Sequence, residues 1–252
     1  MQRPFFAESC SKKMKSLFIL AGGQRCGTSW LYQRLDEHPE IYMAKPRKPE
    51  PKYFLSPSPD KQKYIEKYFS GADDRLCGEK STSYYETSGI AERIASFFPE
   101  AKIVFIFRNP VDRAISNYHF SRDNGLEIRT IEEVFLHEAP APKRIIDTSV
   151  NPFDYLGRGF YSRFLNNYIH VFGRDQICVL GFEEVTADPS RLQVLYSFLG
   201  ISDIPASPQA LSKVNQSSAL FEVSDKVRGK LYALYEEEIA RMTQYIDVKY
   251  WK

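Results

Sequence analysis

The chain has 252 residues, of which 43% are hydrophobic and 14% aromatic, so it is long and apolar enough to bury a substantial core. Its 34 Lys and Arg against 32 Asp and Glu leave a formal charge of +2, which argues against binding of nucleic acid or an acidic membrane through overall charge. Any anion site must therefore be local. The four cysteines are scattered without a C-x-x-C pair, which indicates reduced thiols and no metal site: Cys10, Cys26, Cys77 and Cys178.

Targeting signals are lacking in the sequence as it stands. No apolar stretch approaches the roughly 18 residues that a membrane span needs, and residues 1–15 lack the apolar segment of a signal peptide. We therefore expect a cytoplasmic protein without a membrane span, unless an anchor was trimmed from the chain. With no internal repeat or clear boundary, we expect a tail over 1–13 and a single domain over 14–252.

Short apolar runs recur along the chain between segments of helical periodicity. Such runs are typical of parallel strands that are covered on both faces, so we expect an α/β fold with a central parallel sheet. Asn109-Pro110, Asp188-Pro189 and Thr130-x-x-Glu133 carry the signals of helix starts. The expected strands are 16–21, 102–107 and 176–182, and the expected helices include 28–37 and an amphipathic helix over 224–247.

The first of these strands leads into a glycine loop, in the stretch LFILAGGQRCGTSWL over 17–31. Gly22 and Gly27 have the spacing of a P-loop, but Thr28 stands where the nucleotide-binding lysine belongs. A strand, a glycine loop and a helix aim backbone N–H groups and the positive end of the helix dipole at one point, which favours an anion. Arg25 supplies a positive charge inside the loop. The alternatives at this point are a tight turn without a ligand and a nucleoside triphosphate site with an altered lysine.

A second stretch, KIVFIFRNPVDRAISNYHF over 102–120, places Arg108 at the end of a predicted strand. The carboxyl ends of parallel strands form the usual ligand crevice of an open α/β sheet. Ser116 follows eight residues later, inside the helix that begins at Pro110. An arginine and a hydroxyl suit a terminal phosphate.

Together the two stretches resemble the sulfotransferases that use 3′-phosphoadenosine 5′-phosphosulfate (PAPS), with motifs closest to the carbohydrate-directed, heparan sulfate type. In that family the pattern [KR]-x-G-T-[ST]-x-L binds the 5′-phosphosulfate, and the second motif binds the 3′-phosphate. The resemblance implies a P-loop-like three-layer α/β/α domain, PAPS as co-substrate, adenosine 3′,5′-bisphosphate as product, and no metal. It implies donor contacts from Gly23, Gln24, Arg25, Cys26, Gly27, Thr28, Ser29, Trp30, Arg108 and Ser116.

The same resemblance suggests catalytic residues. Glu50, in KPEPKYF, corresponds to the glutamate proposed as the base in the E-x-H-F-F segment of the carbohydrate branch, with Lys52 replacing its histidine. Lys80, in GEKSTSYYE, corresponds to a lysine that faces the transferred group in G-E-K-S-P-x-Y, with Thr82 replacing the proline. Lys80 and the loop's Arg25 are then expected to stabilise negative charge. The alternatives are a solvated Glu50 in a charged loop and a surface Lys80 after an edge strand.

Other positions are less strongly marked. His119 is a second candidate base. It is ranked below Glu50 because cytosolic sulfotransferases carry a histidine in this region that is not the base, and their catalytic histidine comes from an earlier strand, whereas this chain has no histidine between His38 and His119. The resemblance suggests nucleotide contacts by Tyr161 and, in the stretch 211–218 where a loop closes over the nucleotide in many members, by Lys213 and Asn215.

The acceptor and the oligomeric state are not specified by the sequence. We expect sulfuryl transfer by in-line displacement to a hydroxyl or amine of a saccharide, lipid or small molecule, with no nucleic-acid partner. The alternatives are a kinase-like or NTPase-like enzyme with an altered lysine and a nucleotide-binding module that has lost catalysis. Residues 121–156 match no segment of the family.

Overall fold

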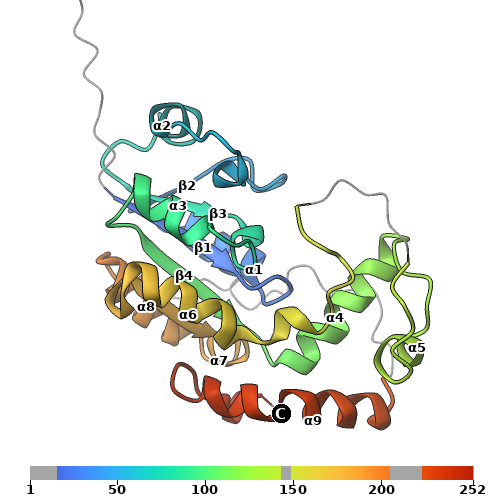
Figure 1. Cartoon of the computed structure of the whole chain (residues 1–252). Coiled ribbons are helices and arrows are strands. Elements are labelled where there is room, and N and C mark those ends of the chain that lie inside the picture. The colour runs from blue at the N-terminus through green and yellow to red at the C-terminus, as the bar shows by residue number, and fades with distance from the viewer. Residues whose placement is uncertain (1–15, 143–148, 205–222, 252) are drawn as a thin grey trace, which may run out of the picture.

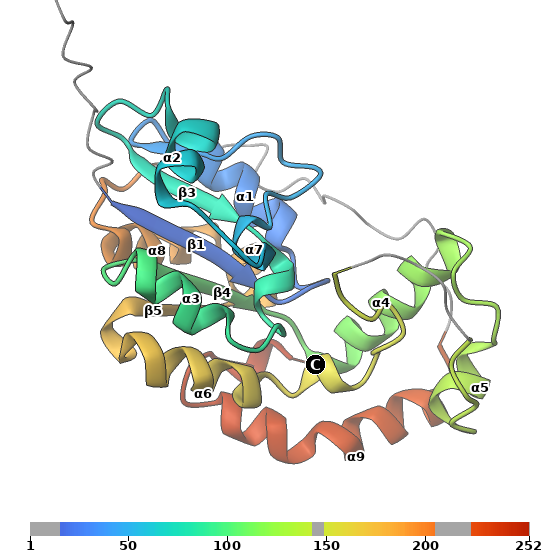
Figure 2. The same ribbon diagram turned by 45° about the horizontal axis from the view of Figure 1, so that its top comes forward.

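The computed structural model describes residues 16–142, 149–204 and 223–251. Within them a parallel sheet of five strands forms the centre of the molecule, in the order β2-β3-β1-β4-β5 (Figures 1 and 2). The strands are β1 (Leu17–Gly22), β2 (Ile41–Met43), β3 (Leu76–Lys80), β4 (Lys102–Phe107) and β5 (Ile177–Gly181). The three strands expected from apolar runs are confirmed to within one residue at each end.

The helices also follow the sequence signals closely. Thr130 forms the capping box with Glu133, and Asn109 caps the helix that starts at Pro110. The helix expected over 224–247 ends five residues earlier than predicted. The longer helices are α1 (Thr28–Asp36), α2 (Lys61–Phe69), α3 (Ile90–Phe97), α4 (Pro110–Asp123), α6 (Tyr161–Phe172), α8 (Leu192–Leu199) and α9 (Asp225–Met242), with α5 (Ile131–Phe135) and α7 (Phe182–Ala187) shorter.

Alternating side chains of the strands build a core on each face of the sheet. In β1, Leu17 and Ile19 belong to one buried cluster with residues of α3 and α6, whereas Phe18 and Leu20 belong to another with residues of α1 and α8. This two-sided burial explains the continuous apolar runs. The predicted arrangement of a sheet between two helical layers is confirmed.

A third apolar cluster lies beyond the sheet and joins α4, α5 and α9. In both views these helices extend past the ends of the strands, and α9 runs back along α6 (Figures 1 and 2). The cluster buries Val111 and Ala114 of α4 against Val227 and Leu231 of α9. It therefore fixes α4, the helix on which Ser116 lies.

All the strand pairs are parallel, so their carboxyl ends lie along one edge of the sheet. That edge carries the glycine loop after β1, Lys80 at the end of β3, Arg108 after β4 and Phe182 after β5. In Figure 2 the strands point toward α4. The fold thus brings together the segments that the sequence analysis singled out.

Candidate active site

The loop that follows β1 is shaped by its glycines. Gly27 is the N-cap of α1 with a φ of 86°, and a Cβ there would lie 2.2 Å from the Cδ2 atom of Phe182. The Gly23 N–H donates to a backbone carbonyl of β4 at 3.0 Å, which ties the loop to the sheet. Gly27 has no side chain that could cap α1, so the N–H groups of Thr28 and Ser29 in its first turn suit an anion.

The two predicted phosphate motifs meet at Arg25. Its Nε and Nη2 atoms donate to Ser116 Oγ at 3.2 and 3.1 Å, and its guanidinium lies 4.7 Å from the ring centroid of Phe120. Burial and the neighbouring charge of Arg108 lower the pKa of Arg25. An arginine nevertheless stays charged at neutral pH, so two cations face each other here and an anion between them would be stabilised.

Arg108 occupies the carboxyl end of β4 beside the start of α7. Its Nε lies 3.6 Å from Glu183 Oε1, beyond hydrogen-bonding distance, and its guanidinium lies 5.8 Å from the ring centroid of Phe182. Within the described residues, this buried Nε has no hydrogen-bond partner. A buried donor without a partner is costly, so the site fits a ligand oxygen.

Tyr161 and Cys26 are buried side chains that contact each other next to the glycine loop. The Tyr161 hydroxyl donates to the backbone carbonyl of Arg108 at 2.7 Å and lies 3.7 Å from Cys26 Sγ, and its ring stacks on Phe107. Burial raises the pKa of both Tyr161 and Cys26. Both side chains are buried and support the segments on either side of the loop, and the nucleotide contacts expected of Tyr161 and Cys26 stay predictions.

Two further residues of the first motif, Gln24 in the loop and Trp30 in α1, have structural contacts that the sequence did not indicate. Trp30 is buried in the core with its ring edge-on to Phe182, so only its backbone remains for a ligand. The Gln24 side chain accepts a hydrogen bond from buried Arg158, which also donates to Glu86 at 2.7 Å. Arg158 lies in a segment without periodicity, and no sequence signal marked it as a support of the loop.

Glu50 and Lys80 form an ion pair beside the loop, with 2.7 Å between Lys80 Nζ and Glu50 Oε1. The Thr82 N–H and hydroxyl each donate to Glu50 Oε2 at 2.9 Å. The Lys80 side chain is 4% exposed and that of Glu50 13%. The alternatives of a solvated glutamate and a surface lysine are therefore wrong, and β3 lies inside the sheet rather than at its edge.

A buried carboxylate next to this pair holds its two segments together. Glu79 accepts hydrogen bonds from the Tyr64 and Ser81 hydroxyls, and Ser81 Oγ in turn accepts the Lys52 N–H at 2.9 Å. Lys52 has a φ of 49°, an unusual value for a lysine. Burial raises the pKa of Glu79. This chain of hydrogen bonds links the end of β3 to the loop that carries Glu50.

Comparison with known proteins identifies the family of the chain. The sequence matches the sulfotransferase domain family over residues 15–226. The chain belongs to this family.

Its relatives among characterised sulfotransferases include enzymes named for heparan sulfate. The chain is 26% identical over 208 residues to the mouse bifunctional heparan sulfate N-deacetylase/N-sulfotransferase 2, a match that covers 77% of this chain and 23% of that protein. It is 29% identical over 203 residues to the human heparan sulfate glucosamine 3-O-sulfotransferase 3B1, covering 79% of this chain and 50% of that protein. The chain thus spans at most half the length of these two relatives.

A solved structure shares the fold over nearly the whole chain. The sulfotransferase from Alicyclobacillus acidocaldarius superposes with a TM-score of 0.72 at 27% sequence identity, covering 93% of this chain and 97% of that one. This likeness confirms the α/β sulfotransferase fold. Membership of this family disfavours the kinase-like or NTPase-like alternative.

In this sulfotransferase domain several residues near the site are buried in the core. His119 is 6% exposed, and burial lowers its pKa. Tyr84 and Tyr85 belong to the core cluster, and their hydroxyls contact the Phe54 N–H and the Arg158 carbonyl. The burial of His119 favours Glu50 as the candidate base. The burial of Tyr84 and Tyr85 in the core indicates a structural role for both.

The cations of the loop over 45–52 differ in their surroundings. Lys45 pairs with Asp36, and Lys52 Nζ donates to Ser149 Oγ at 2.8 Å. Lys48 is exposed. Lys45 is thus held in an ion pair, Lys52 is hydrogen-bonded to a neighbouring segment, and Lys48 faces solvent.

Three further expectations concern the closing loop, metals and membranes. Lys213 and Asn215 lie outside the described residues. In the part of the chain that the structure describes, no group of three or more His, Cys, Asp and Glu side chains could hold a metal ion. The described helices include none that is both long and apolar enough to cross a bilayer.

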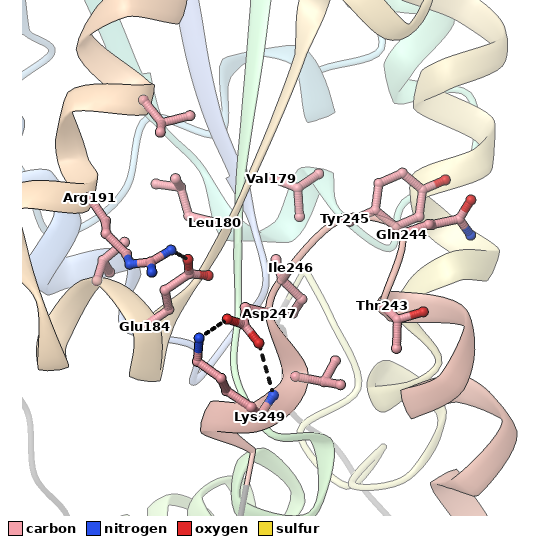
Figure 3. A pocket seen from close by; sticks show the side chains of 13 residues that line it. Val179, Leu180, Glu184, Arg191, Thr243, Gln244, Tyr245, Ile246, Asp247 and Lys249 are labelled. Atoms are coloured by element: carbon pink, nitrogen blue, oxygen red, sulfur yellow. Dashed lines mark hydrogen bonds and ion pairs between the residues drawn. The ribbon is translucent and has the colours of Figure 1, made fainter.

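A cavity of about 790 Å³ lies away from these residues, between β5 and the segment after α9 (Figure 3). Leu180 and Ile246 line it together with two ion pairs, Arg191 with Glu184 and Lys249 with Asp247. Neither Glu50 nor Arg108 lines this cavity. The candidate active site is therefore recognised by its charges and strand ends rather than by the volume of a cavity.

Proposed function

We propose that the protein transfers the sulfuryl group of PAPS to a hydroxyl or amine of a saccharide acceptor. The observation that carries the proposal is the pair of hydrogen bonds from Arg25 to Ser116, which join the two predicted phosphate motifs beside Arg108. The Glu50–Lys80 pair lies at the end of β3, the strand next to β1. Donor-binding groups and a candidate base thus share one edge of the sheet.

The donor supplies an activated sulfuryl group and a leaving phosphate that becomes more negative during transfer. The first-turn N–H groups at Thr28 and Ser29 suit its 5′ end, and Arg108 with Ser116 suits its 3′-phosphate. The unpartnered Nε of Arg108 supports this fit. In the described structure Arg25 contacts Ser116, so we assign Arg25 to the 3′ side as well as to the loop.

Glu50 is proposed as the base that takes the acceptor proton. Its carboxylate is already held by Lys80 and by two groups of Thr82, so one acceptor position remains for a substrate proton. Lys80 cannot neutralise Glu50 and the transferred sulfuryl group fully at once. We propose that Lys80 turns toward the sulfuryl group in the reacting complex, which frees Glu50 Oε1 to accept the acceptor proton.

A saccharide acceptor is favoured by the relatives, because both are named for heparan sulfate. The nearby Lys48 and Lys52 side chains suit a negatively charged saccharide. A lipid or small-molecule acceptor and a cytoplasmic location remain predictions from the sequence.

The test is the transfer of radiolabelled sulfate from PAPS to a panel of saccharides, amines, phenols and lipids. We expect labelling of a saccharide without added metal and loss of labelling in Arg108→Ala. Binding of adenosine 3′,5′-bisphosphate without transfer to any acceptor would support the catalytically inactive module instead. Thermal protection by ATP with Mg²⁺ but not by the bisphosphate would overturn the proposal.

A further inference from the structure

Glu183 is a charged residue at the candidate donor site that the proposed mechanism does not use. It lies just after β5, where Oε1 accepts the Asn109 N–H at 3.1 Å and lies 3.6 Å from Arg108 Nε. Its Oε2 is buried and lacks a hydrogen-bond partner within the described residues. One oxygen of the carboxyl group thus accepts a hydrogen bond, and the other is buried without one within the described residues.

The surroundings of Glu183 disfavour its negative charge. Burial raises the pKa of Glu183 to about 7, and Asp112 of α4 adds to this effect, while the backbone N–H of Glu183 itself, Arg108 and the Asn109 N–H oppose it. Asp112 is itself paired with Arg228 of α9 at 3.0 Å. Cys26 is a further titratable group in electrostatic contact with Glu183, and burial raises its pKa, so its thiol stays neutral near pH 7.

A phosphate at Arg108 would share that arginine with Glu183. Two anions on one arginine repel each other, and the free Oε2 of an ionised carboxylate can only accept hydrogen bonds. A protonated carboxyl group removes the repulsion and becomes an O–H donor to a phosphate oxygen. The geometry therefore couples occupancy of Arg108 to the protonation of its neighbour.

We propose that Glu183 is a proton-linked component of the 3′-phosphate site, which takes up one proton from solvent when the phosphate binds and releases it when the phosphate leaves. The proposal rests on the proposed function, because it needs a 3′-phosphate at Arg108. No covalent bond changes; the proton moves from the buffer to the Glu183 carboxyl group and back.

The decisive experiment measures proton uptake by the wild-type chain. Adenosine 3′,5′-bisphosphate is titrated calorimetrically at pH 8 in two buffers of different ionisation enthalpy. With Glu183 about nine-tenths ionised before binding, we expect uptake of about 0.9 proton. The phosphate contributes little at this pH, since its second pKa is about 6. Adenosine 5′-phosphate, which lacks the 3′-phosphate, is expected to bind without this uptake.

The pH dependence of affinity gives a second measurement. The Kd of the bisphosphate is expected to rise about fivefold between pH 7 and pH 8 in the wild type. In Glu183→Gln, which resembles the protonated side chain, we expect no proton uptake and a change of less than about twofold. Glu184→Gln is the matched control, because Glu184 pairs with Arg191 instead of Arg108 and should behave as the wild type.

The outcomes separate the two proposals. Binding of the bisphosphate without proton uptake at pH 8, or the same uptake in Glu183→Gln, overturns the role of Glu183 and leaves the proposed function standing. No binding of the bisphosphate overturns both. The wild-type measurement needs no variant, so poor folding of Glu183→Gln would not prevent a decision.

Discussion

At the scale of single residues, the main finding is that Glu50 is clamped rather than solvated. Lys80 and Thr82 hold its carboxylate, and the Glu79–Ser81 hydrogen bond holds the backbone of the loop two residues further on. A base must be aimed as well as present, because small errors in position lower the rate of proton transfer steeply. The clamp supports Glu50 in this role.

Replacement of Glu50 tests the assignment directly. Glu50→Gln keeps the shape of the side chain and can still accept from Thr82, so bisphosphate affinity is expected to stay within about twofold. Turnover is expected to fall by about 10²–10⁴-fold, the usual contribution of a general base. Glu66→Gln on the exposed face of α2 is the control for any loss of a carboxylate. Wild-type turnover in Glu50→Gln would exclude Glu50 as the base.

Arg25 is tested by comparing two variants. Arg25→Ala removes both hydrogen bonds to Ser116 and one of the two cations, so bisphosphate affinity is expected to fall about 10–100-fold, as for bonds to charged groups. Arg25→Lys keeps the positive charge but loses the planar guanidinium, so its bisphosphate affinity is expected to lie between those of the wild type and Arg25→Ala. Titration calorimetry measures both. If Arg25→Ala keeps wild-type affinity and turnover, the loop's cation is dispensable.

At the scale of elements, each functional segment begins where a parallel strand ends. Lys80 is the last residue of β3, and the glycine loop, Arg108 and Glu183 come after β1, β4 and β5; these four strands are neighbours in the order β3-β1-β4-β5. Phe182 packs against Gly27, so the ends of β1 and β5 are linked across β4. The shape of the loop thus depends on a side chain far away in the sequence.

Gly27→Ala tests this dependence. A Cβ at Gly27 would collide with the Phe182 ring, and the φ of 86° adds strain. We expect loss of bisphosphate binding by at least about tenfold and a lower melting temperature. Gly89→Ala is the matched control, because Gly89 is also an N-cap with positive φ but has open space around it. Equal bisphosphate affinities in the two variants would mean that crowding by Phe182 is irrelevant.

The elements that the sequence predicted are those whose signal is local. Apolar runs identified β1, β4 and β5, and the two phosphate motifs identified Arg25, Arg108 and Ser116 as neighbours. β3 escaped because it ends in Gly78, Glu79 and Lys80, and β2 has only three residues. Glu183 escaped because an acidic residue in the first turn of a helix is ordinary. Its role depends on Arg108, a contact that only the tertiary structure reveals.

At the scale of the whole molecule, α9 connects the sheet domain with α4 and α5. It packs on α4 in the third apolar cluster and continues to α6, whose first residue supports the Arg108 carbonyl. The two arginines of the donor site thus depend on packing that is spread over the chain. We therefore expect ligand binding and global stability to be linked.

The raised pKa of Glu183 predicts a pH dependence of the free energy of unfolding. Its folded pKa, about 7, is raised above the usual value, so its stabilising contribution is complete below the unfolded pKa and is lost as pH rises toward 7. Glu183→Gln lacks this loss. We expect the free energy of unfolding of the variant minus that of the wild type to increase by on the order of 2 kcal/mol between pH 5 and pH 8. Urea unfolding at both pH values measures the difference, and an unchanged difference would contradict the expectation.

The bisphosphate itself is expected to stabilise the fold. A ligand that binds only the folded state at about 100 times its Kd contributes about 2.7 kcal/mol, which shifts the melting temperature by several degrees for a chain of this size. The shift is expected with and without EDTA. Abolition of the shift by EDTA would indicate a metal in donor binding.

Thr82 carries a consequence beyond this chain. A proline at this position, as in the segment that it resembles, has neither an N–H nor a hydroxyl to offer to the glutamate. Sulfotransferase sequences can therefore be sorted into two groups by whether this position holds a proline. In one group the backbone amide can hold the glutamate, and in the other the lysine must do so without it, so that losing the lysine should be far more damaging.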